Sequence, residues 1–240
     1  MSAALSVTDA VKTYPGAPAP TLDRVNLQVE AGEAFIVLGH TGSGKSTLLR
    51  AIAGLDELDS GTIAMADDGR LSVVFQRPGL FPWLNLRENI ELGARYAANK
   101  GRVDPEYVTG LLRTLGLSEL ENRRVDEISG GQAQRVAIGR ALAIRPSVLL
   151  LDEPFSALDP ATREELQGWL RGLIDELGLT VFMVSHDIHE AVTVGDRIGF
   201  FEAGSGFTRF WEPAAGNVSE AEILEHYRAT GSRTPRESHV

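Results

Sequence analysis

Residues 34–46 read Ala-Phe-Ile-Val-Leu-Gly-His-Thr-Gly-Ser-Gly-Lys-Ser, and this stretch decides the fold. An unbroken apolar run of strand length, 34–38, leads directly into the phosphate-binding pattern G-x-x-x-x-G-K-[ST] at 39–46. Glycines let the backbone turn so that several N–H groups point at one phosphate chain, and the helix that begins near Lys45 adds its positive end. A Gly-rich turn without a ligand is the plain alternative, but it does not explain the complete pattern. The stretch therefore predicts a loop that binds a nucleoside triphosphate. The residues expected to bind it are Gly39, His40, Thr41, Gly42, Ser43, Gly44, Lys45, Ser46 and Thr47.

Two acidic residues follow a second buried strand and complete the predicted chemistry. The apolar run 148–151 passes straight into Asp152 and Glu153. Because ligands of open parallel sheets bind at the carboxyl ends of strands, these carboxylates should face the phosphate loop. Lys45 would supply a cation for the β and γ phosphates, Ser46 and Asp152 would hold Mg²⁺, and Glu153 would act as general base on the attacking water. The alternative is an acidic pair that only caps the next helix.

The composition narrows the class of protein. The chain has 240 residues, 43% of them hydrophobic, which suits one α/β domain with a small inserted subdomain. With 33 acidic and 23 basic residues its formal net charge is −10, so electrostatics oppose binding to nucleic acid, and no nucleic-acid partner is expected. Cysteine is absent, which fits a reducing compartment. No apolar run reaches the roughly 18 residues of a membrane span, and the first residues do not resemble an export signal, so a cytoplasmic location is predicted.

The order of patterns predicts the fold class. Alternation at 5–7 and 25–29 indicates a small antiparallel β layer. From 131 to 201 helical and strand patterns alternate, which favours a mainly parallel sheet. Between them, helical spacing without a strand pattern predicts an inserted helical subdomain at about 86–135. The expected fold is thus α/β, with a P-loop NTPase core. Residues 1–228 would form the domain and 229–240 a disordered tail.

A second phosphate-binding feature lies at 128–135, Ile-Ser-Gly-Gly-Gln-Ala-Gln-Arg. Ser129 and Gln132 fit the S-x-x-[EQ] capping pattern, so a helix should begin here. Two glycines follow Ser129, so this part of the first turn carries no side chains. Such an exposed, positive helix end binds anions. Since the chain already has a phosphate loop, this end implies a nucleotide held between two copies of the protein. The residues expected to bind ATP from the opposite copy are Ser129, Gly130, Gly131 and Gln132.

From Val7 to Phe201 the chain resembles the ATP-binding subunit, or nucleotide-binding domain, of an ABC transporter. The signature of that family is usually Leu-Ser-Gly-Gly-Gln, and here Ile128 replaces the leucine. The resemblance implies an ATPase that uses ATP and Mg²⁺ and works as an ATP-sandwich dimer.

The resemblance also implies roles for four single residues. Tyr14 would stack on adenine, and Gln76 would sense Mg²⁺ and the membrane subunit. Asp159 would link the two sites of the dimer, and His186 would contact the γ-phosphate. Plain alternatives stand beside these roles. Tyr14 also fits a loop aromatic packed on Pro15, Gln76 an exposed strand end, and His186 or Asp159 a helix cap.

The segment 77–84, Arg-Pro-Gly-Leu-Phe-Pro-Trp-Leu, is dense in apolar residues within a Pro-rich loop. It predicts a protein docking surface, unless Phe81 and Trp83 fill the core of the helical subdomain. The resemblance implies that integral membrane permease subunits dock there. The chain is most similar to importers of the nitrate, sulfonate and taurine type, which implies a solute-binding protein and a position on the inner face of the cell membrane. Members of this type commonly carry methionine where this chain has Gln132. A cassette ATPase of a lipid or lipoprotein exporter, or one that remodels a soluble complex, remains the alternative. Residues 207–227 would form a small appended lobe with a regulatory or dimer-contact role.

Overall fold

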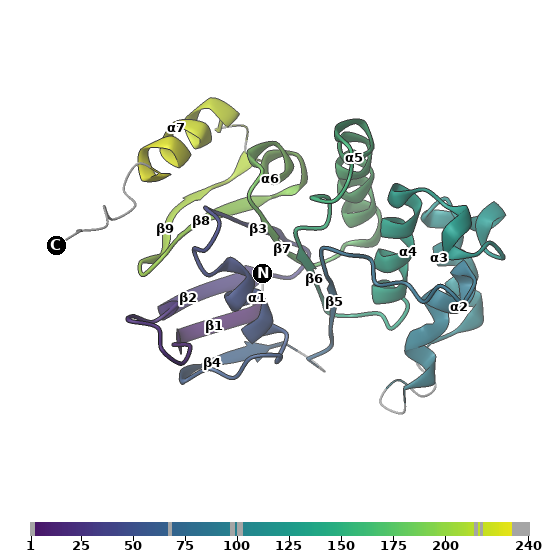
Figure 1. Ribbon diagram of the computed structural model, residues 1–240, viewed down its shortest axis with the longest axis horizontal. Coiled ribbons are helices and arrows are strands. Elements are labelled where there is room, and N and C mark those ends of the chain that lie inside the picture. Colours follow the sequence, from purple (N-terminus) through teal and green to yellow (C-terminus); the bar gives the residue numbers. More distant parts are fainter. Residues whose placement is uncertain are drawn as a thin grey trace.

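A six-stranded sheet runs through the protein and carries the phosphate loop (Figure 1). The computed structural model describes residues 3–66, 69–96, 99, 103–213, 216 and 218–231. Five strands of the sheet are parallel, and β9 adds to one edge in the antiparallel sense. The α/β fold with a mainly parallel sheet is therefore confirmed. In spatial order the strands are β5 (Leu71–Val74), β6 (Val148–Asp152), β7 (Val181–Ser185), β3 (Ala34–Leu38), β8 (Arg197–Glu202) and β9 (Gly206–Trp211).

A separate antiparallel sheet forms the predicted β layer. Its order is β2 (Leu22–Glu30), β1 (Ala3–Lys12) and β4 (Ser60–Met65), and Val7 of β1 pairs with Leu27 on one side and Ile63 on the other. The strand β4 was not predicted from the sequence. It completes the layer seen below the main sheet in Figure 1.

The uninterrupted apolar run of β3 is explained by burial on both faces, as expected for an internal parallel strand. Ile36 and Leu38 belong to the core shared with α4, α5 and α6, whereas Phe35 and Val37 pack with the antiparallel layer and α1. The phosphate loop thus starts from a strand fixed on both sides. The helices flanking the sheet are α1 (Lys45–Ile52), α5 (Pro160–Leu177), α6 (Ile188–Val194) and α7 (Glu220–Gly231).

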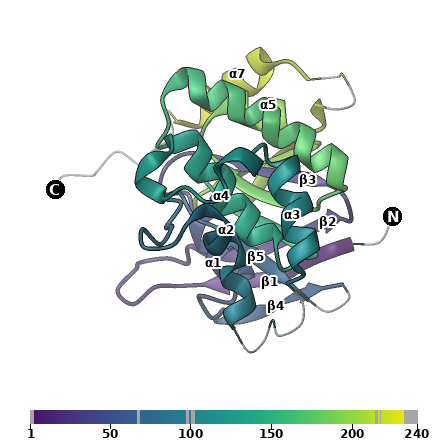
Figure 2. The same cartoon turned by 90° about the vertical axis from the view of Figure 1, so that its right-hand side faces the viewer.

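Between β5 and β6 the described residues form helices and no named strand, as predicted for the inserted subdomain. Figure 1 shows α2, α3 and α4 gathered at one end of the molecule, and Figure 2 shows that end facing the viewer. The backbone bridge between Asn85 and Arg124 joins two distant parts of this segment. The predicted end near 135 falls inside α4, which continues because its middle turns are buried against α2. The elements are α2 (Leu86–Ile90), η1 (Glu91–Arg95), α3 (Pro105–Thr114), η3 (Ser118–Leu120), η4 (Val125–Glu127) and α4 (Gly130–Leu142).

The C-terminal region folds back onto the main sheet. β9 pairs with β8, and α7 buries Ile223 completely in the larger core. This helix continues through Gly231, so residues 229–231, predicted as the start of a tail, are helical instead. The rest of that predicted tail, 232–240, lies outside the described residues. Within the described parts of the chain, no helix combines the length and apolar character needed to span a membrane.

Candidate nucleotide-binding site

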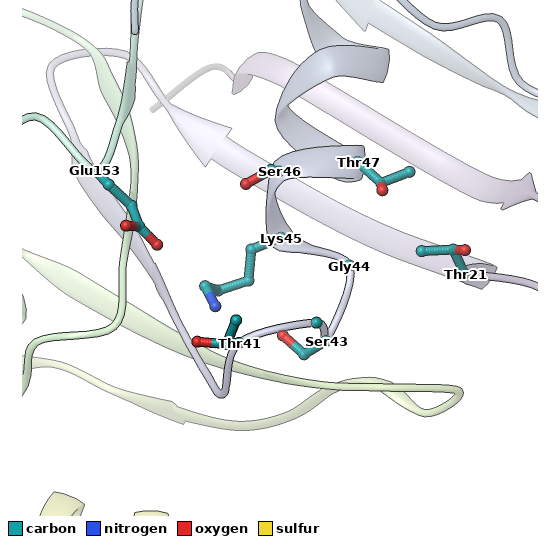
Figure 3. Close-up of a pocket in the computed structure, with 9 residues that line it drawn as sticks. Thr21, Thr41, Ser43, Gly44, Lys45, Ser46, Thr47 and Glu153 are labelled. Carbon is teal, nitrogen blue, oxygen red and sulfur yellow. The ribbon is translucent and has the colours of Figure 1, made fainter. Parts of the chain in front are cut away.

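The phosphate loop leaves the end of β3 and leads into α1, as the motif predicts. A Cβ atom on Gly39 would lie 2.3 Å from the carbonyl oxygen of Phe201, so only glycine fits there. Gly44 precedes the helix with a φ of 103°, a conformation that side chains rarely allow. The loop borders a pocket together with two residues from other elements, Thr21 and Glu153 (Figure 3). The lining residues are Thr21, Thr41, Gly42, Ser43, Gly44, Lys45, Ser46, Thr47 and Glu153.

Lys45 places a cation in the hollow of this loop. Its side chain is 4% exposed, and its Nζ donates hydrogen bonds to the carbonyl oxygens of Gly39 at 2.7 Å and His40 at 2.9 Å. Burial lowers the pKa of Lys45, while the carboxylates of Glu153 and Asp152 oppose that shift. Nearby, the buried Ser43 hydroxyl has no hydrogen-bond partner among the described residues. A buried cation and an unsatisfied hydroxyl on one loop fit the oxygens of a phosphate chain.

The donors predicted for Mg²⁺ meet at the edge of this pocket. The Ser46 hydroxyl donates to Oδ1 of Asp152 at 3.3 Å, although the two residues are 106 positions apart. Burial raises the pKa of Asp152, the hydrogen bond from Ser46 lowers it, and the neighbouring Glu153 raises it further. A hydroxyl and one carboxylate suit Mg²⁺, which usually takes its other ligands from phosphates and water. This donor set therefore fits the ion.

Glu153 and His186 come together from adjacent strands. Glu153 follows β6 and His186 follows β7, and the His186 Nδ1 lies 3.2 Å from Oε1 of Glu153. Glu153 has a φ of 46°, and its N–H donates to the carbonyl of Val184 at 3.0 Å, which holds this unfavourable backbone in place. Figure 3 shows the Glu153 carboxylate across the pocket from Lys45. A carboxylate next to a histidine is thus presented to the phosphate loop.

Tyr14 lies beside the end of the loop. Its hydroxyl is 2.8 Å from Oδ2 of Asp56 and 3.4 Å from the Thr47 hydroxyl, and the residue is 38% exposed. Arg50 holds the same Asp56 carboxylate through two hydrogen bonds. The ring is therefore anchored by its hydroxyl and keeps a free surface. Thr21, from the same irregular segment between β1 and β2, lines the pocket, and no motif in the sequence pointed to it.

Gln76 and Asp159 lie away from this pocket. Gln76 is exposed after β5, which neighbours β6, and among the described residues no hydrogen bond joins it to Ser46 or Asp152. Asp159 is the N-cap of α5 and accepts a hydrogen bond from the Thr162 N–H at 3.1 Å. Hydrogen bonds from the Thr162 side chain and backbone lower the pKa of this carboxyl. The capping alternative for Asp159 is thus realised, and a role between two copies of the chain is compatible with it.

The predicted second phosphate site forms a pocket of its own at the start of α4. The Ser129 hydroxyl accepts from the Gln132 N–H at 3.2 Å, and the Gln132 side chain accepts from the Ser129 N–H at 2.9 Å, which is a complete capping box. A Cβ on Gly131 would lie 2.8 Å from the Thr162 side chain, so glycine allows α4 and α5 to approach. This pocket shares no lining residue with the phosphate-loop pocket. Its lining residues are Ser129, Gly131, Gln132, Arg135, Thr162, Glu165 and Leu166.

Two curated relatives resemble most of this chain. The sulfate/thiosulfate import ATP-binding protein CysA of Mycobacterium tuberculosis is 44% identical over 215 residues, which cover 85% of this chain and 60% of the relative. The taurine import ATP-binding protein TauB of Escherichia coli is 40% identical over 208 residues, which cover 84% of this chain and 81% of the relative. The chain therefore spans about 60% of the length of the CysA relatives.

Solved structures share the fold over nearly the whole chain. The dimeric, post-hydrolysis ATP-binding cassette MJ0796, bound to ADP and Pi, matches with a TM-score of 0.71 and 33% identity over 87% of this chain and 98% of its own. The cbiO1 protein of Clostridium perfringens, part of the ABC transporter complex cbiONQ, matches with a TM-score of 0.79 and 26% identity over 98% of this chain and 97% of its own. The model of the protein family described as "ABC transporter" matches residues 22–156 of this chain. Together with the loop, the paired carboxylates and the capped α4, these similarities place the chain in the ABC transporter family.

Proposed function

We propose that this chain is the ATP-binding and ATP-hydrolysing subunit that energises import of a small anion through a separate membrane permease. One observation carries the proposal. The loop with the phosphate-binding sequence carries a buried lysine and a serine that pairs with an aspartate, and a glutamate beside a histidine faces it. Each element performs one task in phosphoryl transfer, which depends mainly on positioning and charge neutralisation.

The reaction proposed for this site is hydrolysis of the terminal phosphate of ATP. Phosphate oxygens would take the Lys45 ammonium from the carbonyls of Gly39 and His40, to which it now donates. Ser46 and Asp152 would hold Mg²⁺, which neutralises charge on the phosphates when bound. Water attacks the γ-phosphorus, its proton passes to the Glu153 carboxylate, and the bond to the ADP oxygen breaks, so ADP and phosphate leave. His186 would contact the γ-phosphate while holding Glu153.

A second copy of the chain would complete each nucleotide site. The capped start of α4 carries two glycines, so its N–H groups and the positive helix end are not covered by side chains. Its pocket is nevertheless separate from the phosphate loop of the same chain. Ser129, Gly130, Gly131 and Gln132 would therefore bind the nucleotide of the opposite copy. Asp159 caps the N–H of Thr162, and Thr162 lines the same pocket, which supports a link between the two sites through Asp159.

The permease would dock near the end of β5. Trp83 is 64% exposed, its ring packs edge-on against Phe81 at 5.0 Å, and Phe75 is also exposed. Gln76 follows Phe75 directly, so it could report permease contact to the adjacent strand β6. Exposed aromatic side chains on a loop are typical of protein interfaces.

Two relatives support a sulfur oxyanion or a sulfonate as the transported solute, because one is a sulfate/thiosulfate import ATP-binding protein and the other a taurine import ATP-binding protein. A solute-binding protein would deliver this solute, and the chain itself would lie in the cytoplasm against the inner face of the membrane. Selectivity would reside in the other subunits.

Two measurements test the proposal. Phosphate release from Mg·ATP should rise with the square of protein concentration at low concentration and vanish in Lys45→Ala. Brisk hydrolysis by a strictly monomeric chain would refute the shared site. Purification from detergent-solubilised membranes should yield a stoichiometric polytopic partner, whereas an entirely soluble complex would refute the transport role.

A further inference from the structure

The C-terminal helix α7 touches the phosphate loop directly. The ring centroids of His40 and Tyr227 are 4.1 Å apart, and Nε2 of His40 lies 3.2 Å from the Thr230 hydroxyl. These contacts join residues separated by 187 and 190 positions in the sequence. Figure 1 shows α7 on the side of the main sheet formed by β8 and β9.

Two aromatic rings and one hydrogen bond hold the side chain of His40. The Phe200 ring meets the His40 ring edge-on at 5.9 Å and also meets the Tyr227 ring of α7 edge-on at 5.8 Å. The Thr230 hydroxyl also lies 3.1 Å from the His226 carbonyl and 3.0 Å from the Tyr227 carbonyl, to which it donates its one hydrogen. With that hydrogen used within α7, the Thr230 oxygen is the acceptor for Nε2 of His40 in the tautomer that carries the proton on Nε2. The imidazole orientation is thus set by the helix.

The main chain of His40 is a support for the whole loop. Its carbonyl oxygen accepts hydrogen bonds from Nζ of Lys45 at 2.9 Å and from the N–H of Ser43 at 3.2 Å. A residue whose side chain is anchored by α7 therefore holds the turn of the loop and its catalytic cation. Gly231 leaves room for this contact, since a Cβ there would lie 2.9 Å from Cε1 of His40.

The helix that makes this contact is itself fixed to the body of the protein. Glu220 bonds to His189 of α6 at 2.8 Å, and Glu222 accepts from Arg209 of β9. Ile223 is fully buried, and the His226 ring packs on Trp211 with a centroid separation of 5.3 Å. Burial raises the pKa of Tyr227, and the charge of the Glu153 carboxylate raises it further. The contact with His40 is therefore made by a docked helix.

We infer that α7 belongs to the nucleotide site, with Thr230 and Tyr227 as positioning residues that hold His40 and preset the phosphate loop. The inference rests on the proposed binding of ATP at this loop. It predicts that changes in α7, far from the motif in sequence, alter nucleotide affinity. If α7 only packed on the sheet, changes in α7 would instead alter the stability of the protein and leave nucleotide affinity unchanged.

The decisive variants change the contact and little else. Thr230→Val removes the hydroxyl at nearly constant shape, Thr230→Ser restores it, and Tyr227→Ala removes the ring. Glu225→Gln on the exposed side of α7 is the matched control. Affinity for a non-hydrolysable ATP analogue with Mg²⁺ is measured by titration calorimetry on the full chain, together with kcat and KM for ATP.

Thr230→Val and Tyr227→Ala should each weaken binding about three- to tenfold, as expected for one lost hydrogen bond or ring contact. Both should raise KM while kcat stays within about twofold, and Thr230→Ser should bind like the parent. In a His40→Ala background, Thr230→Val should have no further effect, because its partner is gone.

Parental affinity in Thr230→Val and Tyr227→Ala would overturn the inference, even if both variants melt earlier. If Tyr227→Ala does not fold, Thr230→Val and the double-variant cycle decide alone. Failure of the parent chain to bind the analogue would instead refute the proposed function, so the two failures are distinguishable.

Discussion

Replacing Glu153 with glutamine should separate nucleotide binding from hydrolysis. Glutamine keeps the size of the side chain, and the bond from the residue 153 N–H to the Val184 carbonyl needs no carboxylate, so the strained backbone at φ 46° should survive. The variant loses the proton acceptor that faces the loop, and a placed general base is worth about 10²–10⁴ in rate. That loss corresponds to about 3–5 kcal/mol in the activation barrier.

Binding should respond in the opposite direction. The Glu153 carboxylate helps to raise the pKa of Asp152, which shows that the two negative charges repel each other in this site. Removing one of them favours the ionised Asp152 and reduces repulsion of the triphosphate. We therefore expect Glu153→Gln to bind Mg·ATP as tightly as the parent or more tightly, and to accumulate as a dimer.

The assay is phosphate release at saturating Mg·ATP, with affinity measured by calorimetry and dimerisation by sedimentation. Glu106→Gln, at an exposed position in the first turn of α3, is the matched control for removing one carboxylate. Hydrolysis by Glu153→Gln within about twofold of the parent would refute the assignment of the general base. A loss of binding together with hydrolysis would refute the electrostatic part of the reasoning.

Three further outcomes are expected. Burial raises the pKa of Glu190, although the hydrogen bond from Ser185 lowers it, so the parent should lose stability as pH rises from about 4.5 through the folded-state pKa. In denaturant titrations, the stability of Glu190→Gln relative to the parent should therefore rise across that pH range. A stability difference that does not change with pH would contradict this. Gly39→Ala would place a Cβ 2.3 Å from the Phe201 carbonyl oxygen, so it should lower the unfolding free energy by about 1–3 kcal/mol and weaken nucleotide binding at least tenfold. Normal nucleotide binding by this variant would show that the loop can shift. Trp83→Ala, at a side chain 64% exposed, should change stability by no more than about 0.5 kcal/mol yet abolish co-purification with the permease; retained association would exclude this surface.

Local sequence was sufficient wherever the backbone itself makes the site. The loop from Gly39 to Ser46 needs glycines at fixed positions and a strand before it, so its pattern predicts its shape. The capping box of Ser129 and Gln132 forms within four residues and was predicted for the same reason. The approach of Ser46 to Asp152 spans 106 positions, yet it followed from the rule that parallel strands present their carboxyl ends at one edge.

Features that depend on the fit of distant side chains were not predicted. β4 begins with Ser60 and Gly61 and alternates only weakly, so its pairing with β1 comes from the tertiary structure. Thr21 carries no motif and reaches the pocket only because the segment between β1 and β2 folds over Gly44. The role predicted for Gln76 also depends on a partner outside this chain, and the chain alone gives it no contact with Asp152.

His40 shows how a position that a motif leaves open can still be structurally determined. The pattern G-x-x-x-x-G-K-[ST] constrains the residues whose backbone or side chain meets phosphate and leaves the first x free. In this chain that position faces α7. The His40 side chain contacts Tyr227 and Thr230, while the His40 carbonyl accepts a hydrogen bond from Lys45. Replacing His40 alone with alanine should therefore weaken nucleotide binding at least as much as Thr230→Val, because it removes both contacts with α7. A variant that binds normally would mean that the glycines and Lys45 hold the loop without help from α7.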